Sequence, residues 1–170
     1  GKAAREYKYR VKGGNTGINI GVPAPMAYFP FGGMGESFFG DLHGQVDNLL
    51  KILTENCLVQ ALQNNRAVLC ILGDAVHSED LGEMENMDSS ILIMDLIFTL
   101  IRTFPANVFY LRGNHDDFAE EISKGGVPQG LLWEKSLHDL RGPRYRDAMQ
   151  RFYDLLPYVA VSPDYICCHA

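Results

Sequence analysis

Three polar clusters, each following an apolar run, constrain this chain more than any other feature of its sequence. They are GDLHG at residues 40–44, GD at 73–74 and GNHD at 113–116, and a single histidine, His169, follows the apolar residues 165–168. In each cluster a glycine permits a tight turn at the end of a strand, which directs the next side chain into a shared cleft. We therefore expect an α/β domain whose ligand-binding groups gather at the carboxyl ends of its strands.

The spacing of apolar residues along the chain supports strands that alternate with helices. Continuous apolar runs predict strands at 37–39, 67–72 and 107–111, and a hairpin at 158–161 and 165–168. Helical periodicity predicts helices at 46–57, 91–103 and 144–156. The Asp-Ser-Ser sequence at 88–90 is expected to cap the second helix, and residues 81–86 and 123–130 are expected to be loops.

Residues 1–36 differ from the rest of the chain, because they are rich in glycine and proline and show no sustained period. We expect them to form an irregular N-terminal arm, with a short strand at Tyr7–Val11. The periodic part, from residue 37 onward, is expected to form the domain that carries the polar clusters.

Composition excludes several classes of function. The net charge of −6 argues against a protein that coats nucleic acid, because that mode of binding needs a clustered basic face. The most apolar stretch, residues 91–101, is interrupted by Asp95 and is too short to cross a bilayer. The four cysteines form no CxxC pair, so we expect reduced thiols and a reducing, cytoplasmic compartment.

The side chains of the polar clusters are of the kinds that bind divalent metal ions. Carboxylates, an amide oxygen and imidazoles together indicate a site for Mn²⁺, Fe or Zn²⁺. They fit a thiolate site or an all-oxygen Ca²⁺ site less well. Asp41 and His43 are separated by one residue, so both point to one side of an extended segment. A carboxylate such as Asp74 can bridge two cations that activate a water for attack on phosphorus. A neighbouring imidazole can then protonate the leaving oxygen.

Each cluster taken alone also has a simpler interpretation. An aspartate after a glycine is often a helix cap or a turn residue, and a lone His115 or His169 fits a capping or a buried structural histidine. The occurrence of all four features, each after an apolar run, favours a shared site. Elsewhere, His138 and residues 79–85 are expected to be solvated. The aromatic residues expected to pack in the core are Trp133, Phe152 and Tyr153.

Four segments together resemble the calcineurin-like metallophosphoesterases, and within them the phosphoprotein phosphatase branch. They are FGDLHGQ at 39–45, LGD at 72–74, LRGNHD at 111–116 and FYDLLPYVAVSPDYICCHA at 152–170. The resemblance covers residues 38–170 and does not reach the N-terminal arm. It implies a central β-sandwich flanked by helices, with residues 37–170 forming the N-terminal portion of the catalytic domain.

The resemblance also implies a role for each polar residue. Asp41 and His43 would bind the first of two divalent metal ions, Asp74 would bridge both, and Asn114 and His169 would bind the second. Mn²⁺ is the first expectation, with Fe or Zn²⁺ as alternatives. Asp74 and His115 would be the catalytic residues, with His115 as the general acid. Arg112 and Asn114 would contact the substrate phosphate.

Two positions depart from the family pattern. After Gly73-Asp74 the family continues with an aspartate that orients the general-acid histidine and an arginine that binds phosphate, where this chain has His77 and Ser78. Another partner for His115 is then expected, and Asp80, Asp116 and Glu79 are the candidates. Serine lacks a guanidinium group, so phosphate binding must depend on the metals, Arg112 or another residue. These differences resemble bacterial members of the family, including effector phosphatases.

The chain also stops at His169-Ala170, before family strands that carry a further metal ligand and a further arginine. We expect the C-terminal part of the domain to be missing from this sequence, either because it is on a separate fragment that acts as a partner, or because it is disordered, deleted or cut from the sequence. Without it, sheet edges would be left uncovered.

The function expected on these grounds is that of a metal-dependent phosphoprotein phosphatase. It would hydrolyse phosphate monoesters on Ser/Thr or Tyr of a phosphoprotein or phosphopeptide, by means of a water activated by two metals. The alternatives are a dinucleoside polyphosphate hydrolase and a catalytically degenerate metal-binding scaffold. The expected location is cytoplasmic, with delivery into a host cell as the alternative for an effector.

Overall fold

The computed structural model describes residues 31–32, 37–40, 42–54, 57–79, 82–161 and 166–169. Three expectations fall on residues outside these ranges: the strand at Tyr7–Val11, the metal ligand Asp41, and Asp80 as a partner of His115. Most of the arm expected at residues 1–36 lies outside them as well. Within that arm, the described residues Phe31–Gly32 form a short strand, β1.

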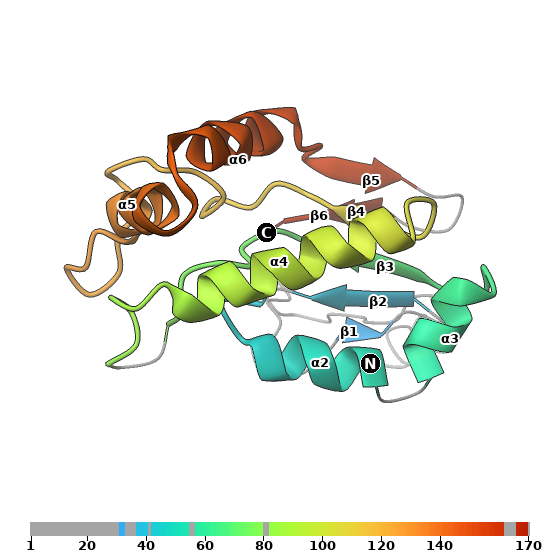
Figure 1. The fold of residues 1–170 in the computed structure, drawn as a ribbon. Coiled ribbons are helices and arrows are strands. Elements are labelled where there is room, and N and C mark those ends of the chain that lie inside the picture. Colours follow the sequence, from blue (N-terminus) through green and yellow to red (C-terminus); the bar gives the residue numbers. More distant parts are fainter. Residues whose placement is uncertain are drawn as a thin grey trace, which may run out of the picture.

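A four-stranded sheet forms the centre of the fold (Figure 1). Its spatial order is β1 (Phe31–Gly32), β2 (Ser37–Gly40), β3 (Val68–Ile71) and β4 (Val108–Tyr110). β1 pairs antiparallel with β2, whereas β2, β3 and β4 run parallel to one another. Parallel neighbours require crossover connections, and helices supply them here. The predicted α/β class and the three predicted strands are therefore confirmed, with small differences at the strand ends.

Helices α2 (Val46–Thr54) and α4 (Asp88–Thr103) pack with the sheet in the main hydrophobic core. Strand β3 shows how the core is divided, because successive side chains of a strand point to opposite faces. Leu69 and Ile71 are buried in the main core, whereas Cys70 belongs to a smaller cluster. Each aliphatic side chain buried in this way stabilises the fold by roughly 1.5–3 kcal/mol.

Two predictions about helix ends are wrong. The helix expected at 46–57 is two helices, because α2 ends at Thr54 and α3 (Leu58–Gln63) begins after Cys57, whose φ of 54° is left-handed. Helix α4 begins at Asp88, so residues 88–90 form its first turn instead of capping it. The Ser90 hydroxyl accepts a hydrogen bond from the backbone N–H of His77 at 2.9 Å. The start of α4 is thereby joined to the loop that follows β3.

Helices α5 (Gln129–Arg141) and α6 (Pro143–Leu155) lie side by side at one end of the domain (Figure 1). The second was predicted; the first was not, and its first two residues overlap the loop expected at 123–130. Trp133 and Tyr153 are fully buried, and the indole N–H donates to the tyrosine hydroxyl at 3.0 Å. Phe152 packs edge-on against Phe98, with 5.0 Å between ring centroids. The predicted aromatic core residues are confirmed.

The predicted hairpin is present as β5 (Val159–Val161) and β6 (Ile166–Cys168), which pair antiparallel. Ala160 and Cys167 pack in the smaller cluster with Cys70 and Leu111, so the hairpin contacts the face of the sheet away from the main core. The wider β-sandwich implied by the family resemblance stays a prediction.

All four cysteines lie among the described residues and are free thiols, as predicted. Burial, together with the neighbouring Cys167, raises the pKa of the Cys70 thiol to about 12. None of the helices in the described part of the chain combines the length and the apolar character needed to span a bilayer.

Candidate metal centre

Four of the five predicted metal ligands meet around the carboxylate of Asp74, and the fifth, Asp41, is outside the described residues. Asp74 follows β3 and is only 2% exposed. Its Oδ2 atom lies 3.2 Å from Nε2 of His169 and 4.0 Å from Nε2 of His43. The Nε2 atom of His169 also lies 2.8 Å from Oδ1 of Asn114. Strand ends that are far apart in the sequence thus supply one compact group of donors.

The loops after β3 and β4 interlock so closely that both need glycine. A Cβ atom on Gly113 would lie 2.0 Å from Oδ1 of Asp74, and one on Gly73 would lie 2.3 Å from the backbone nitrogen of Gly113. The backbone N–H of His115 donates to Oδ1 of Asp74 at 2.7 Å. The position of the Asp74 carboxylate is therefore determined by the backbone of the neighbouring loop.

Asp116 is the buried residue that joins these two loops. Its Oδ2 accepts hydrogen bonds from the backbone N–H groups of Gly113 at 2.8 Å and Asp74 at 3.2 Å, and its Oδ1 accepts from the Tyr110 hydroxyl at 2.7 Å. Burial raises the pKa of Asp116 to about 6, although these hydrogen bonds oppose the shift. Asp116 thus supports the scaffold of the site rather than orienting the ring of His115.

Backbone strain concentrates at the same place. His43, Asp74 and His77 have φ angles of 38°, 48° and 67°, in the left-handed region that L-residues rarely adopt. The backbone N–H of His43 donates to the carbonyl of Asp74 at 2.8 Å, which helps to hold both residues in this conformation. Such strain persists where the surrounding structure enforces it, and it is common at functional sites.

The contacts of His169 provide a test of whether these residues fit a metal. Its Nδ1 lies 2.9 Å from the carbonyl oxygen of Leu72, which can only accept, so Nδ1 carries the ring proton. Its Nε2 then presents a lone pair toward the oxygens of Asn114 and Asp74. A rotated Asn114 amide could donate to Nε2, but the Asp74 carboxylate can only accept, so a second ring proton or a bound cation is needed to satisfy that contact. A metal-ligating histidine commonly donates its other nitrogen to a backbone carbonyl, so the arrangement fits a metal site.

The donor set is incomplete as described. Within the described ranges, no group of three or more His, Cys, Asp or Glu side chains has the spacing of an assembled metal site. The group here includes an amide oxygen, from Asn114, and lacks the undescribed Asp41. The arrangement fits a divalent cation by its chemistry, and the assignment of individual ligands stays a prediction.

His115 lies beside this group, and its ring contacts two other histidines. The ring is edge-on to His43, with 5.4 Å between centroids, and its Nδ1 lies 3.2 Å from Nδ1 of His77. Burial lowers the pKa of His115, with an opposing contribution from Asp74. The expected partners of this ring were Asp80, Asp116 and Glu79. Asp80 lies outside the described residues, and the Asp116 carboxylate accepts from the backbone of the two loops. Among the described side chains, His77 lies against the ring of His115, a contact that no local sequence pattern marks.

Arg112, which was expected to contact phosphate, is held by the end of α6 and the loop after β4. Its guanidinium donates to the carbonyl of Tyr153 at 3.0 Å and forms an ion pair with Asp117 at 2.5 Å. Its side chain is 16% exposed. Its role in phosphate binding stays a prediction.

A second cation at the site, Lys124, was not singled out from the sequence. It forms an ion pair with Glu79, whose carboxylate is also 3.7 Å from Nε2 of His43. Glu79 therefore belongs to the mouth of the site, and its prediction as a solvated loop residue is only partly right. The turn closed by hydrogen bonds between Lys124 and Val127 places this lysine there, and no local sequence signal marks such a contact.

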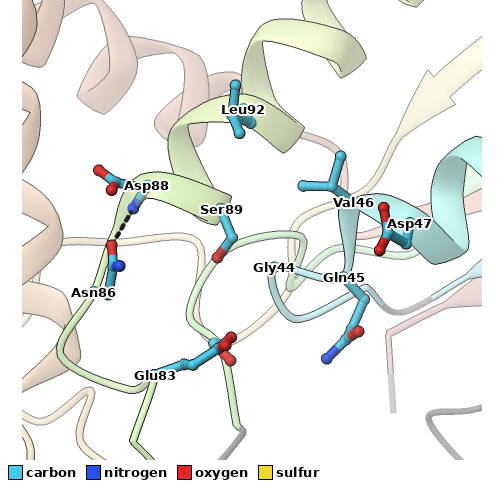
Figure 2. A pocket seen from close by; sticks show the side chains of 10 residues that line it. Gly44, Gln45, Val46, Asp47, Glu83, Asn86, Asp88, Ser89 and Leu92 are labelled. Carbon is cyan, nitrogen blue, oxygen red and sulfur yellow. Dashed lines mark hydrogen bonds between the residues drawn. The ribbon is translucent and has the colours of Figure 1, made fainter.

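A pocket of ≈ 360 Å³ adjoins the site at Gly44 and Ser78 (Figure 2). Its acidic lining residues are Asp47, Glu83 and Asp88. The side chain of Asn86 accepts a hydrogen bond from the backbone N–H of Asp88 at 2.8 Å, which shapes one wall. The pocket and the donor group are neighbours, because Gly44 directly follows His43 and Ser78 lies in the loop that follows Asp74. The donors themselves do not line the pocket.

Comparison with protein families gives one extensive match. The model of the calcineurin-like phosphoesterase family matches residues 38–170. This range contains all five predicted metal ligands as well as His77 and His115.

Comparison with curated proteins gives shorter matches to a different class of enzyme. The chain is 43% identical over 60 residues to malonate-semialdehyde dehydrogenase 2 of Bacillus mycoides, which is 35% of this chain and 12% of that protein. It is 46% identical over 57 residues to malonate-semialdehyde dehydrogenase of Bacillus pumilus, 34% of this chain and 12% of that protein. These alignments are longer than the 37 residues that precede the phosphoesterase match, so they extend into it. The chain spans about an eighth of the length of these relatives.

Proposed function

This chain belongs to the calcineurin-like phosphoesterase family, and we propose that it is the N-terminal part of a metal-dependent phosphoprotein phosphatase that hydrolyses phosphate monoesters. The observation that carries the proposal is the convergence of His43, Asn114 and His169 on the buried carboxylate of Asp74. A dehydrogenase activity is not proposed, because the relatives of that class share only 12% of their own length with this chain.

The proposed ligands divide between two cations. His43 and Asp41 would hold the first, Asn114 and His169 would hold the second, and Asp74 would offer its carboxylate to both. When bound, two such ions supply Lewis acidity toward phosphate and an activated water. Mn²⁺ is proposed first, with Fe or Zn²⁺ as alternatives, because the donors are mixed imidazole, amide and carboxylate.

The remaining residues of the site act on the substrate. His115 stands within reach of the same group and is proposed to donate a proton to the leaving oxygen. Lys124 and Arg112 are the nearby cations proposed to attract the phosphate, in place of the arginine that Ser78 replaces. Asp116, Gly73 and Gly113 hold the loops after β3 and β4 together, so that the side chains of the site keep their positions.

The proposal includes a partner. Val161 and Ile166 of the hairpin are 74% and 71% exposed, which is unusual for apolar side chains of a small sheet. We propose that the C-terminal part of the same domain covers this hairpin and completes the second cation site. A dinucleoside polyphosphate hydrolase remains the alternative within the same family, and release of nucleotide from such a substrate would support it.

The experiment that tests the proposal measures phosphate release with increasing Mn²⁺, from phosphopeptides and from a dinucleoside polyphosphate. It uses the chain together with the remainder of its domain. We expect metal-dependent release of phosphate from phosphopeptides. We expect Asp74→Asn to reduce turnover to the detection limit and to weaken the binding of both ions, because one carboxylate would neutralise two cations. Asp139→Asn, on the exposed face of α5, is the matched control. Full activity of Asp74→Asn would contradict the two-metal mechanism.

A further inference from the structure

Arg112 makes contacts with three different segments around the site. Its side chain is only 16% exposed. The guanidinium donates to the carbonyl of Tyr153 at 3.0 Å and to the carboxylate of Asp117 at 2.5 Å, and it lies 5.9 Å from the ring centroid of Tyr158. The backbone N–H of Arg112 donates to the carbonyl of Pro157 at 2.9 Å. One residue thus joins the loop after β4 to the end of α6 and to the start of the hairpin.

These contacts depend on properties that only arginine has. Its guanidinium is planar, stays charged and carries five N–H groups in a fixed fork, so it can bind a carboxylate, a carbonyl and an aromatic face at the same time. A charged group that is mostly shielded from water is costly to leave without partners. The three segments therefore hold Arg112 in place, and Arg112 in turn holds them together.

The segments that Arg112 joins carry the two residues proposed for the second cation. Asn114 follows Arg112 by two positions in the loop after β4. Continued by one residue, the antiparallel register of β5 and β6 brings Tyr158 opposite His169. The Nε2 atom of His169 lies 2.8 Å from Oδ1 of Asn114. Arg112 is thus connected to Asn114 through the backbone and to His169 through the hairpin.

We propose that Arg112 is a positioning residue for the second cation site, because it fixes Asn114 and His169 relative to each other. The inference rests on the proposed function and adds to it. Attraction of phosphate by Arg112 needs only the charge of the guanidinium, whereas positioning needs its hydrogen bonds. The first cation site has a different support, since the backbone N–H of His43 donates to the carbonyl of Asp74.

The second site has particular need of such support. Its imidazole follows a hairpin of two short strands, in which Val161 and Ile166 are 74% and 71% exposed. Ligands that are already in place bind a cation more tightly than ligands that binding must first order. Groups that hold metal ligands in position typically contribute about 10–100-fold to metal affinity. Loss of the Arg112 contacts should therefore weaken the ion held by His169 and Asn114.

The test measures binding of Mn²⁺ to the chain together with the remainder of its domain. In Arg112→Met we expect the affinity for the second ion to fall by roughly 10–100-fold, and the affinity for the first to change by less than about twofold. Isothermal titration gives both affinities, and electron paramagnetic resonance distinguishes two coupled Mn²⁺ ions from one isolated ion. Arg146→Met is the matched control, because Arg146 also pairs with a carboxylate, that of Glu134, and lies over a ring, that of Phe118.

Further variants separate the hydrogen bonds of Arg112 from its charge. Asp117→Asn keeps the shape of the carboxylate and weakens its bond to the guanidinium, so we expect a smaller loss of affinity for the same ion. Arg112→Lys keeps the charge without the fork, so we expect it to restore only part of the affinity. Adding Arg112→Met to His169→Ala should lower the second affinity little further, because both changes act through the same ligand.

The outcomes separate this inference from the proposed function. An unchanged second affinity in a folded Arg112→Met variant, or full restoration by Arg112→Lys, would overturn the positioning role. A raised KM for phosphopeptide with normal binding of both ions would overturn it as well, and would leave Arg112 as a phosphate-binding residue alone. If Arg112→Met does not fold, Asp117→Asn decides, and an unchanged second affinity there overturns the role.

The phosphatase proposal fails on a different result. Absence of turnover with every substrate would overturn that proposal, while the Mn²⁺ titrations would still decide the role of Arg112. A wild-type protein that binds fewer than two Mn²⁺ ions would overturn both.

Discussion

The loops after β3 and β4 and the hairpin of β5 and β6 contribute to one site in different ways. The loops carry residues that are almost fully buried, such as Asp74 at 2% and Asp116 at 0% exposure, and they hold each other through backbone hydrogen bonds. The hairpin exposes 74% of Val161 and 71% of Ile166, and the ring of the following residue, His169, contacts the carbonyl of Leu72 and the side chain of Asn114.

This difference indicates which part of the site is formed before a cation binds. Interlocked loops that contain buried charge are costly to rearrange, because any movement leaves buried polar groups without partners. A histidine that is held through its ring, on a hairpin with exposed apolar side chains, can move more readily. We therefore expect the Asp74 side of the site to be organised by the fold, and the His169 side to depend more on the cation and on the proposed C-terminal partner.

The largest effect short of losing Asp74 is expected from His115→Asn. This change should reduce kcat by roughly 10²–10⁴-fold and leave metal content unchanged, because the ring is proposed to supply a proton rather than a ligand. Steady-state kinetics and metal analysis of the purified variant provide the measurement. Loss of metal in this variant would mean that His115 is a metal ligand, and that the part of the site organised around Asp74 includes it.

The pH dependence of the free energy of unfolding tests how far Asp116 is shielded from water between the two loops. Its folded pKa of about 6 lies above the ordinary value of 3.8 for an aspartate, so protonation favours the folded state. The stabilisation is fully present below pH of about 4 and is lost as the pH rises through about 6, a change of up to about 3 kcal/mol.

Urea unfolding of the metal-free protein between pH 4 and 7 provides that measurement. The wild-type protein should lose stability relative to Asp116→Asn as the pH rises over this range. Asp139→Asn, at an exposed position, should show no such trend. A difference between wild type and Asp116→Asn that does not vary with pH would mean that the loops are more hydrated than the structure indicates.

The hairpin side is tested by His169→Ala. We expect the affinity for the more weakly held ion to fall by roughly 10–100-fold, because the second site loses its imidazole and keeps Asp74 and Asn114. The free energy of unfolding of the metal-free variant should fall by only about 1–3 kcal/mol, since the ring makes two hydrogen-bond contacts, with the Leu72 carbonyl and with Asn114. Isothermal titration with Mn²⁺, with His138→Ala as control, separates these effects. A large loss of unfolding free energy in metal-free His169→Ala would show that the hairpin is fixed to the core as firmly as the loops after β3 and β4.

The smallest effect is expected at the mouth of the site, from Lys124→Met. Exposed ion pairs contribute about 0–1 kcal/mol, so we expect a few-fold rise in KM for phosphopeptide and little change in kcat. Lys135→Met, which removes the exposed partner of Asp139, is the matched control. A large fall in kcat for Lys124→Met would instead indicate a contact with phosphate in the transition state.

Sequence reasoning was most successful where local chemistry decides the structure. The runs before Gly73 and Gly113 are strands, Trp133 and Tyr153 are core residues, and the polar clusters do meet at strand ends. It failed where a helix boundary depends on packing. Helix α5 has too mixed a surface to stand out as a periodic pattern, and the break at Cys57 has no glycine or proline to mark it.

Residue type and short-range geometry are enough to predict the kinds of donor, their order, and the glycines that allow Asp74 and Asn114 to leave their strands. Long-range packing, by contrast, places His77 against His115, Asp116 against the backbone of both loops, and Lys124 beside Glu79. These contacts join residues 38, 42 and 45 positions apart, and a distance across a folded core is not encoded in any local pattern.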